Sequence, residues 1–151
     1  MIEPYTAVGI IPKSRAIKTR ADIAANLKHV INVSRFAHSM GGLFIPVRLI
    51  AIPEGALQSF VDEITDMNHV DYAHHCAIDI PGKETDALAE LARELKVFVM
   101  AQAKARHPDW PDLFFNTAFF IDPDGAIVLK HYKVSTLLPW ERSVSPHDLF
   151  D

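Results

Sequence analysis

Glu54 is the first residue whose position suggests chemistry, within the stretch Ile50–Gln58, IAIPEGALQ. The apolar run Leu49–Ile52 stops at Pro53, and the acid follows at once. This order predicts a buried strand that delivers a carboxylate to its own carboxyl end, where open α/β sheets keep their functional groups. A carboxylate is costly to remove from water unless it is paired or working. A solvated glutamate that opens a loop is the alternative.

Lys133 is the second such residue, because it directly follows the last predicted strand in the series Lys130-His131-Tyr132-Lys133. If the strand runs through Tyr132, Lys133 stands at a strand end, as Glu54 does. Opposite charges at neighbouring strand ends can meet over one pocket, where a Lys–Glu pair can stabilise an oxyanion and move a proton. The charge pattern alone favours a solvated basic cluster after a hairpin, and spacing by itself does not decide.

The remaining candidates are Cys76 and three nearby histidines, His69, His74 and His75. Imidazole and thiolate groups are zinc ligands, but their spacing here does not match a closed structural site. Two adjacent histidines on a strand would also point to opposite faces. We therefore expect surface histidines in a loop, and neither a metal nor another cofactor.

Alternating strands and helices must position these residues. The predicted elements of the first half are a strand Ala7–Ile11 buried on both faces, a helix from Thr19 to Gly41-Gly42, a strand Val47–Ile52, a short amphipathic helix around Leu57–Ile64, and an extended piece Ala77–Ile80. Those of the second half are a helix Glu84–Lys96, a strand Val97–Ala101, a surface loop His107–Pro111, and strands Phe115–Ile121 and Ala126–His131.

The turn Asp122-Pro123-Asp124-Gly125 joins the last two strands. Proline sets the first turn dihedral and glycine accepts a positive one, so this tetrapeptide predicts a tight hairpin. A hairpin after alternating strands and helices indicates an α/β fold with a mixed sheet.

Length, composition and charge limit the classes of protein to which the chain can belong. With 151 residues, 49% of them hydrophobic and 23% charged, the chain is expected to form one globular domain. A net charge of −4 gives no basic footprint for nucleic acid or for a membrane surface. No apolar run approaches the roughly eighteen residues of a spanning helix, and the N-terminus lacks the basic residues of a signal peptide. One cysteine is consistent with a reducing compartment, so we expect a cytoplasmic location.

Five ordered motifs carry a resemblance: VGIIP, IAIPEGALQ, IPGKETDALAELAREL, NTAFFIDPDGAIVLKHYK and LLPWE. Together they resemble the N-terminal half of the carbon–nitrogen hydrolases, the nitrilase and amidase superfamily, over nearly the whole chain. The part after Lys133 is most similar to aliphatic amidases. Several motifs in the same order are much more specific than any one of them.

The resemblance implies a four-layer α-β-β-α sandwich and a Glu-Lys-Cys triad that acts on a small-molecule, non-peptide amide or nitrile. Glu54 matches the general base and Lys133 the lysine that stabilises the tetrahedral intermediate. Glu141 falls near a second, auxiliary acid of amidases, although a solvated loop acid is the alternative there. Asn116 matches an Asn-Thr pair and is expected to make a structural hydrogen bond. The chemistry needs a thiolate, stabilisation of an oxyanion and a proton for the leaving nitrogen.

The family's nucleophilic cysteine lies on a strand beyond the last of these motifs, and the sequence ends at Asp151 first. Cys76 precedes the lysine and lies outside a strand-to-helix elbow, so a small half-buried residue is expected there. We therefore expect residues 1–151 to be one carbon–nitrogen hydrolase domain, truncated before its nucleophile.

Three hypotheses follow. The chain is part of an enzyme that hydrolyses amides or nitriles when the remaining half is present, or an inactive fragment used for binding or assembly, or a small α/β ligand-binding domain in which Glu54 and Lys133 line a pocket. Family members commonly form homo-oligomers. Half of a layered sandwich should also expose an apolar face and associate.

Overall fold

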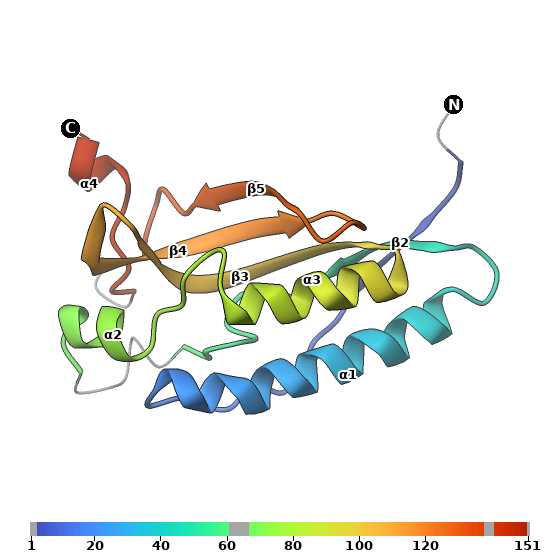
Figure 1. Ribbon diagram of the computed structural model, residues 1–151, viewed down its shortest axis with the longest axis horizontal. Coiled ribbons are helices and arrows are strands. Elements are labelled where there is room, and N and C mark those ends of the chain that lie inside the picture. Colours follow the sequence, from blue (N-terminus) through green and yellow to red (C-terminus); the bar gives the residue numbers. More distant parts are fainter. Residues whose placement is uncertain (1–2, 61–66, 138–140, 151) are drawn as a thin grey trace.

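One mixed sheet organises the part of the chain that the computed structural model describes, residues 3–60, 67–137 and 141–150 (Figure 1). The elements in chain order are β1 (Thr6–Gly9), η1 (Arg20–Asp22), α1 (Ile23–Gly41), β2 (Val47–Ala51), α2 (His69–His75), α3 (Lys83–Leu95), β3 (Phe98–His107), β4 (Trp110–Ile121), β5 (Ile127–Tyr132) and α4 (His147–Phe150). The strands lie in the order β1-β2-β3-β4-β5. The first three are parallel, and β4 and β5 add antiparallel pairing, as the sequence predicted.

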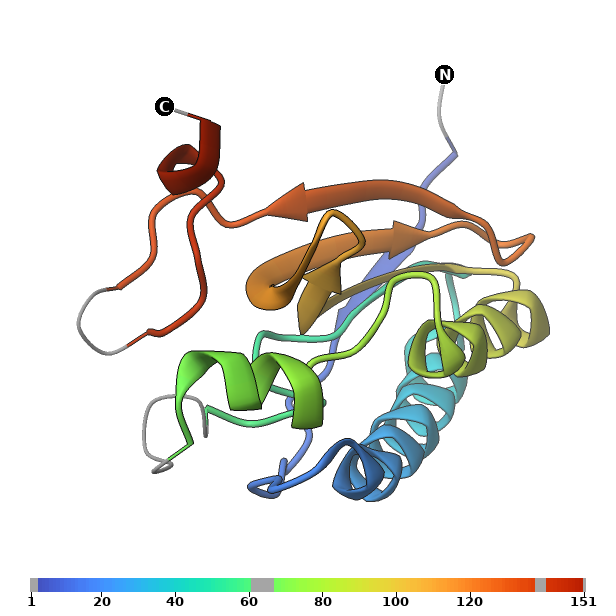
Figure 2. The ribbon, with the colours of Figure 1, turned by 60° about the vertical axis from the view of Figure 1, so that its left-hand side comes forward.

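Helices α1 and α3 pack against each other on one face of the sheet, as both views show (Figures 1 and 2). Their apolar stripes, which include Ile23 and Val30 of α1 and Leu88 and Leu91 of α3, join the hydrophobic core. Fully burying such a side chain contributes about 1.5–3 kcal/mol. Among the described residues, no long helix covers the opposite face, and the short α4 lies beyond one end of the sheet (Figures 1 and 2).

Both long helices confirm the predicted boundaries closely. The backbone N–H of Thr19 donates to Oδ2 of Asp22 over 2.8 Å and starts the turn η1, which leads into α1. Helix α1 ends at Gly41, within the predicted stop. Helix α3 ends at Leu95, because Lys96 adopts a left-handed conformation with φ of 54° and so terminates the helix. None of the helices in the described ranges combines the length and apolar content needed to cross a bilayer.

The first strand differs from its prediction. It spans Thr6–Gly9 rather than Ala7–Ile11, and the prediction that it is buried on both faces is wrong. Its residues alternate between half-buried and exposed, because β1 lies at an edge of the sheet and pairs only with β2. A short apolar run cannot distinguish an edge strand from a central one.

The strand β3 is twice as long as the predicted Val97–Ala101, since it continues to His107. The predicted surface loop His107–Pro111 is accordingly wrong, because β4 already begins at Trp110 and the two strands form a hairpin. Pairing with β4 satisfies the backbone groups of this polar half of β3, and such tertiary pairing overrides local polarity.

The segment between β2 and α3 also departs from its prediction. Residues Glu54–Phe60 form turns rather than the start of a helix, and residues 61–66 of that predicted helix lie outside the described part of the chain. A helix forms later instead, at His69–His75, where Oδ1 of Asn68 caps it by accepting from the N–H of Asp71 over 2.9 Å. The expectation that His74 and His75 lie in a loop is therefore wrong.

Two short features are confirmed. Ile78, within the predicted extended piece, makes a parallel bridge to Ala105 of β3. In the β4–β5 hairpin, Gly125 has a φ of 84°, which favours glycine, and Oδ1 of Asp122 accepts the N–H of Ala126 over 2.8 Å. The residue types of this turn thus determine its conformation.

An ion-pair network fixes the segment before α3 to the sheet. Arg20 binds both the buried Glu84, over 2.9 Å, and Asp79, over 2.8 Å. Arg106 of β3 binds the same Asp79 over 2.8 Å. Burial would raise the pKa of Asp79, but hydrogen bonds from the two arginines outweigh it and lower that pKa.

Candidate active site

Glu54 stands at the exit of β2, as predicted. The N–H of Ile52 donates to the carbonyl of Met100 over 2.8 Å, so the chain stays paired with β3 until Pro53 turns it away. The N–H of Gly55 then donates to the side chain of Gln102 over 3.0 Å, which fixes the turn to the sheet. The Glu54 carboxylate is half exposed and accepts from Nδ2 of Asn116 over 2.6 Å. It is therefore both hydrogen-bonded and reachable from solvent.

The register of three strands builds a polar row across the sheet. Lys104 of β3 pairs with Asn116 of β4, and the N–H of Lys133, just after β5, donates to the carbonyl of Asn116 over 2.8 Å. Side chains at matched positions on neighbouring strands lie on one face with Cβ atoms about 4.5–5.5 Å apart. Lys104, Asn116 and Lys133 are therefore neighbours although they are distant in sequence.

Glu141 packs against this row and is almost fully buried, at 2% exposed. Its Oε1 accepts from Nζ of Lys104 over 3.1 Å, Nδ2 of Asn116 over 2.7 Å and Oγ of Ser143 over 2.6 Å. Its Oε2 accepts from Nζ of Lys133 over 2.7 Å. The alternative of a solvated loop acid at Glu141 is wrong.

Lys133 joins the two acids. Its Nζ lies 2.7 Å from Oε2 of Glu141 and 3.5 Å from Oε1 of Glu54, so the fold brings together the three residues singled out from the sequence. Burial would lower the pKa of Lys133, but the hydrogen bond to Glu141 and the charges of both acids outweigh it and raise that pKa. Lys133 is consequently a cation at neutral pH, suited to hold an anionic oxygen.

The contact with Lys133 that raises the pKa of the lysine also lowers the pKa of Glu141. Burial would raise its pKa, but the hydrogen bonds from Lys133, Ser143 and Asn116 and the charge of Lys104 outweigh it. The pKa of Glu141 is held well below its usual range. The site thus contains an ionised carboxylate even though it is buried.

Sequence reasoning missed Lys104 and Gln102, because the strand that carries them was predicted to end at Ala101. A signal was present: in MAQAKAR, alanines alternate with Gln102, Lys104 and Arg106. This period of two is typical of a strand. The hydrogen bond expected at Asn116 is present, since its side chain joins Glu54 to Glu141, and its structural rather than catalytic role stays a prediction.

Cys76 lies outside this network. It caps the C-terminal end of α2 and is fully buried, rather than half-buried as predicted. Burial raises the pKa of its thiol to about 11. Because the thiolate is the reactive form, Cys76 is unsuited to attack a substrate at neutral pH.

Two of the three candidate histidines make contacts away from this network. Nε2 of His74 pairs with Asp112 over 2.7 Å, and the ring of His69 stacks on Phe114 with centroids 4.4 Å apart. Within the described residues, no group of three or more His, Cys, Asp and Glu side chains could hold a metal ion.

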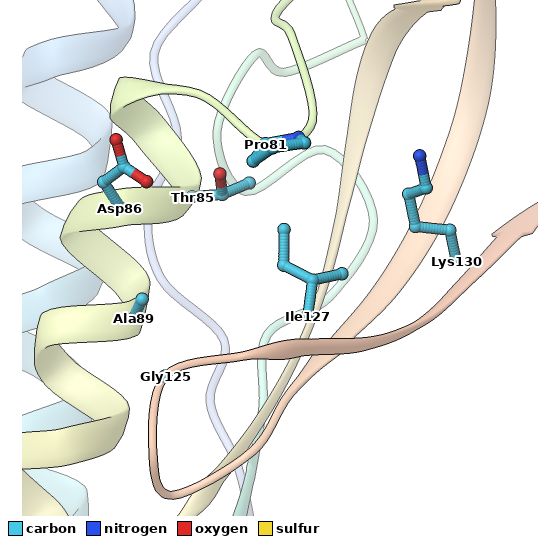
Figure 3. A pocket seen from close by; sticks show the side chains of 7 residues that line it. All are labelled: Pro81, Thr85, Asp86, Ala89, Gly125, Ile127 and Lys130. Atoms are coloured by element: carbon cyan, nitrogen blue, oxygen red, sulfur yellow. The ribbon is translucent and has the colours of Figure 1, made fainter.

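A separate hollow of about 330 Å³ lies between α3 and the β4–β5 hairpin (Figure 3). Its lining residues are Pro81, Thr85, Asp86, Ala89, Gly125, Ile127 and Lys130. None of Glu54, Lys133 and Glu141 contributes to it. This hollow is therefore separate from the cluster formed by Glu54, Lys133 and Glu141.

Comparison with known proteins agrees with this arrangement. The family model described as carbon-nitrogen hydrolase matches residues 7–147. Formamidases of Bacillus thuringiensis (strain Al Hakam) and Bacillus cereus (strain AH820) are each 30% identical over 125 residues, which cover 83% of this chain and 35% of theirs. The chain thus spans about a third of the length of these relatives.

Solved structures show the same fold at low identity. A carbon–nitrogen hydrolase from Helicobacter pylori G27 superposes with a TM-score of 0.64 at 14% identity, over 89% of this chain and 41% of that one. A Saccharomyces cerevisiae member of branch 10 of the nitrilase superfamily gives a TM-score of 0.55 at 18% identity, over 80% and 41%. These neighbours confirm the α/β fold with a mixed sheet.

Proposed function

The chain belongs to the carbon–nitrogen hydrolase family, and from that premise we propose that residues 1–151 supply the base and the oxyanion-stabilising cation of an amide-hydrolysing site. The observation that carries the proposal is the placement of Nζ of Lys133, 2.7 Å from Glu141 and 3.5 Å from Glu54. A cation at a strand end between two acids, one of them open to solvent, suits hydrolysis of a small polar substrate.

In the proposed reaction, Glu54 takes the proton of a thiol, and the sulfur attacks the amide carbon. The carbonyl oxygen becomes an oxyanion, which the ammonium of Lys133 stabilises. The carbon–nitrogen bond then breaks, and Glu54 returns the proton to the leaving nitrogen. Water, deprotonated by Glu54, hydrolyses the resulting thioester and regenerates the thiol. Glu141 stays ionised throughout and holds Lys133 in place.

The thiol in this proposal comes from polypeptide outside residues 1–151. The only cysteine of the sequence is Cys76, which is buried, carries a raised pKa and has no contact with Glu54 or Lys133 among its described hydrogen bonds. The substrate class is a small amide rather than a nitrile, a choice supported by the similarity to formamidases.

The test is ammonia release from formamide and acetamide by the protein isolated from its native source, with its mass determined. Replacing the base in Glu54→Gln should lower kcat at least about 100-fold. Glu90→Gln, an exposed change of the same kind on α3, should leave kcat unchanged.

Full activity in Glu54→Gln would remove Glu54 from its role. An unmodified protein that hydrolyses neither amides nor nitriles would refute the proposal and favour a non-catalytic fragment or a ligand-binding domain.

A further inference from the structure

Lys104 is a lysine buried in the sheet beside the proposed site. Its side chain is 2% exposed, and its Nζ lies 3.1 Å from Oε1 of Glu141, a carboxylate buried to a similar degree. A buried ammonium is costly unless a carboxylate compensates it, so a purely structural role would be served as well by an apolar side chain. Packing alone therefore does not account for a buried Lys104–Glu141 ion pair at this position.

The two oxygens of Glu141 are held differently. Oε1 faces the interior, where Lys104, Asn116 and Ser143 all donate to it. Oε2 faces Lys133, whose Nζ also approaches Glu54. The carboxylate is thus clamped from its buried side, and its other oxygen sets the position of the lysine that faces solvent.

The balance of charges in this cluster also connects Lys104 to the function of Lys133. The cluster contains two acids, Glu54 and Glu141, and two lysines, Lys104 and Lys133. Glu141 contacts both lysines, and Lys133 contacts both acids. If Lys104 were uncharged, Lys133 alone would compensate both carboxylates. With Lys104 charged, its ammonium compensates the charge of Glu141 from the buried side. The charge of Lys133 then remains available to Glu54 and to a developing oxyanion.

We propose that Lys104 is a positioning residue, which fixes Glu141 through Oε1 so that Oε2 holds Lys133 facing Glu54. The inference rests on the proposed function for its catalytic meaning, but its geometry can be tested without turnover. Lys104 acts through Glu141, because its side chain is buried and its Nζ lies 3.1 Å from Oε1 of that carboxylate.

The test is a titration of the Glu141 carboxyl by ¹³C NMR in the folded chain. Lys104→Met keeps the length of the side chain and removes its charge. The titration midpoint of Glu141 should rise by about one to three pH units, because an opposite charge within hydrogen-bonding distance is lost. A merely structural ion pair would raise this midpoint as well, so the positioning of Lys133 has a readout of its own, the ¹³Cε signal of Lys133 at neutral pH. This signal should shift in Lys104→Met, because Glu141 then no longer holds Nζ of Lys133 in one place, and an unchanged Lys133 signal would overturn the proposal.

Lys130→Met is the matched control, because Lys130 is an exposed lysine of β5 that contacts the carbonyl of Ile80 rather than an acid. It should leave the Glu141 midpoint unchanged. Should Lys104→Met fail to fold, Lys104→Gln, which keeps a donor without the charge, takes its place with the same expected rise.

An unchanged Glu141 midpoint in either folded variant would overturn the proposal. Failure of both variants to fold would assign Lys104 to stability alone and would overturn it as well. A raised Glu141 midpoint together with a shifted Lys133 signal, in a protein that hydrolyses no amide, would uphold the positioning role of Lys104 while refuting the proposed function. An unchanged midpoint in an active enzyme would do the reverse.

Discussion

At the scale of single residues, Glu141 shows how a buried charge is maintained. Removing a carboxylate from water costs several kcal/mol, and this cost is offset only when the remaining lone pairs are filled. Lys104, Asn116 and Ser143 fill them on one oxygen, and Lys133 on the other. Hydrogen bonds to charged groups contribute about 1.5–3 kcal/mol each, so together they can exceed the cost.

Removing this carboxylate should destabilise the fold strongly. Glu141→Ala leaves the buried Lys104 without its 3.1 Å partner, and breaking a buried pair costs about 3–5 kcal/mol. Glu94→Ala removes an exposed acid paired with Arg35 and should cost less than about 1 kcal/mol. Urea unfolding at neutral pH measures both. Equal losses in the two variants would contradict the role given to Glu141.

The lowered pKa of Glu141 also predicts a pH dependence. Its pKa is lower in the folded chain than in the unfolded one, where it is about 4.3, so its stabilisation is complete above that pH. The stabilisation is lost as pH falls from there towards the folded pKa. Between pH 5 and pH 3 the unfolding free energy should therefore fall more steeply for the unchanged chain than for Glu141→Gln. Parallel urea-unfolding curves over this range would show that Glu141 does not carry this dependence.

At the scale of elements, the side chain of Gln58 bonds the backbone of β3 where no neighbouring strand pairs with it. Beyond the end of β2, Oε1 of Gln58 accepts from the N–H of Lys104 over 2.7 Å. Nε2 of Gln58 donates to the carbonyls of Lys104, over 2.9 Å, and Cys76, over 2.8 Å. Farther along β3, Ile78 resumes the pairing. The position of Lys104 in the site therefore depends on a glutamine in a turn.

Replacing that glutamine should expose the backbone of Lys104. Gln58→Leu leaves the buried N–H of Lys104 and the carbonyl of Cys76 without these bonds, at about 1–3 kcal/mol for each unsatisfied group. The carbonyl of Lys104 keeps its bond from the N–H of Ile78. Hydrogen exchange at the N–H of Lys104 should accelerate at least about tenfold, in proportion to the stability lost. Asn32→Leu, on the exposed side of α1, should leave that exchange rate unchanged. An unaltered rate in Gln58→Leu would mean that another group supports β3 there.

The hairpin turn predicts a contrast between two glycines. Gly125 has a φ of 84°, and a Cβ there would also displace the guanidinium of Arg93, so Gly125→Ala should cost about 1–2 kcal/mol. At Gly9 a Cβ would meet nothing within 4 Å, and Gly9→Ala should be close to neutral. Thermal unfolding of the two variants compares them. A neutral Gly125→Ala would show that the turn can adopt another conformation.

At the scale of the whole molecule, the sheet leaves apolar side chains on the face away from α1 and α3. Side chains alternate along a strand, so Phe98 and Phe120 point away from the side to which the buried Val99 and Ile121 point. They help line a hollow of about 460 Å³. Phe98 is 41% exposed. The expectation that the chain exposes an apolar face is consistent with these positions.

Such a surface predicts association, and homo-oligomer formation stays a prediction. Light scattering at about 100 μM should detect species larger than a monomer, since contiguous apolar patches mark interaction surfaces. Phe98→Ser should shift the distribution towards the monomer, whereas Phe44→Ser, at an exposed site in the α1–β2 loop, should not. A monodisperse monomer for the unchanged chain would contradict the expectation.

The sequence by itself determined the elements that local patterns specify. Apolar stripes at helical spacing gave α1 and α3, the Asp122–Gly125 turn gave the last hairpin, and an apolar run before an acid placed Glu54 at a strand end. Each of these signals depends on residues within a few positions of one another, so chain stereochemistry and periodicity are sufficient.

Only the tertiary structure decided which side chains come together at the site and which of them are buried. The length of β3 and the burial of Glu141 depend on strand register and on contacts such as Lys104–Glu141 and Glu54–Asn116, which span 37 and 62 residues. No local pattern specifies such pairs, because whether a lysine or an acid is solvated or buried depends on what packs over it. Glu54 and Lys133 could be singled out because each follows a predicted strand and matches a family motif, whereas the alternation in MAQAKAR indicates a strand through Lys104 but not the burial of its side chain against Glu141.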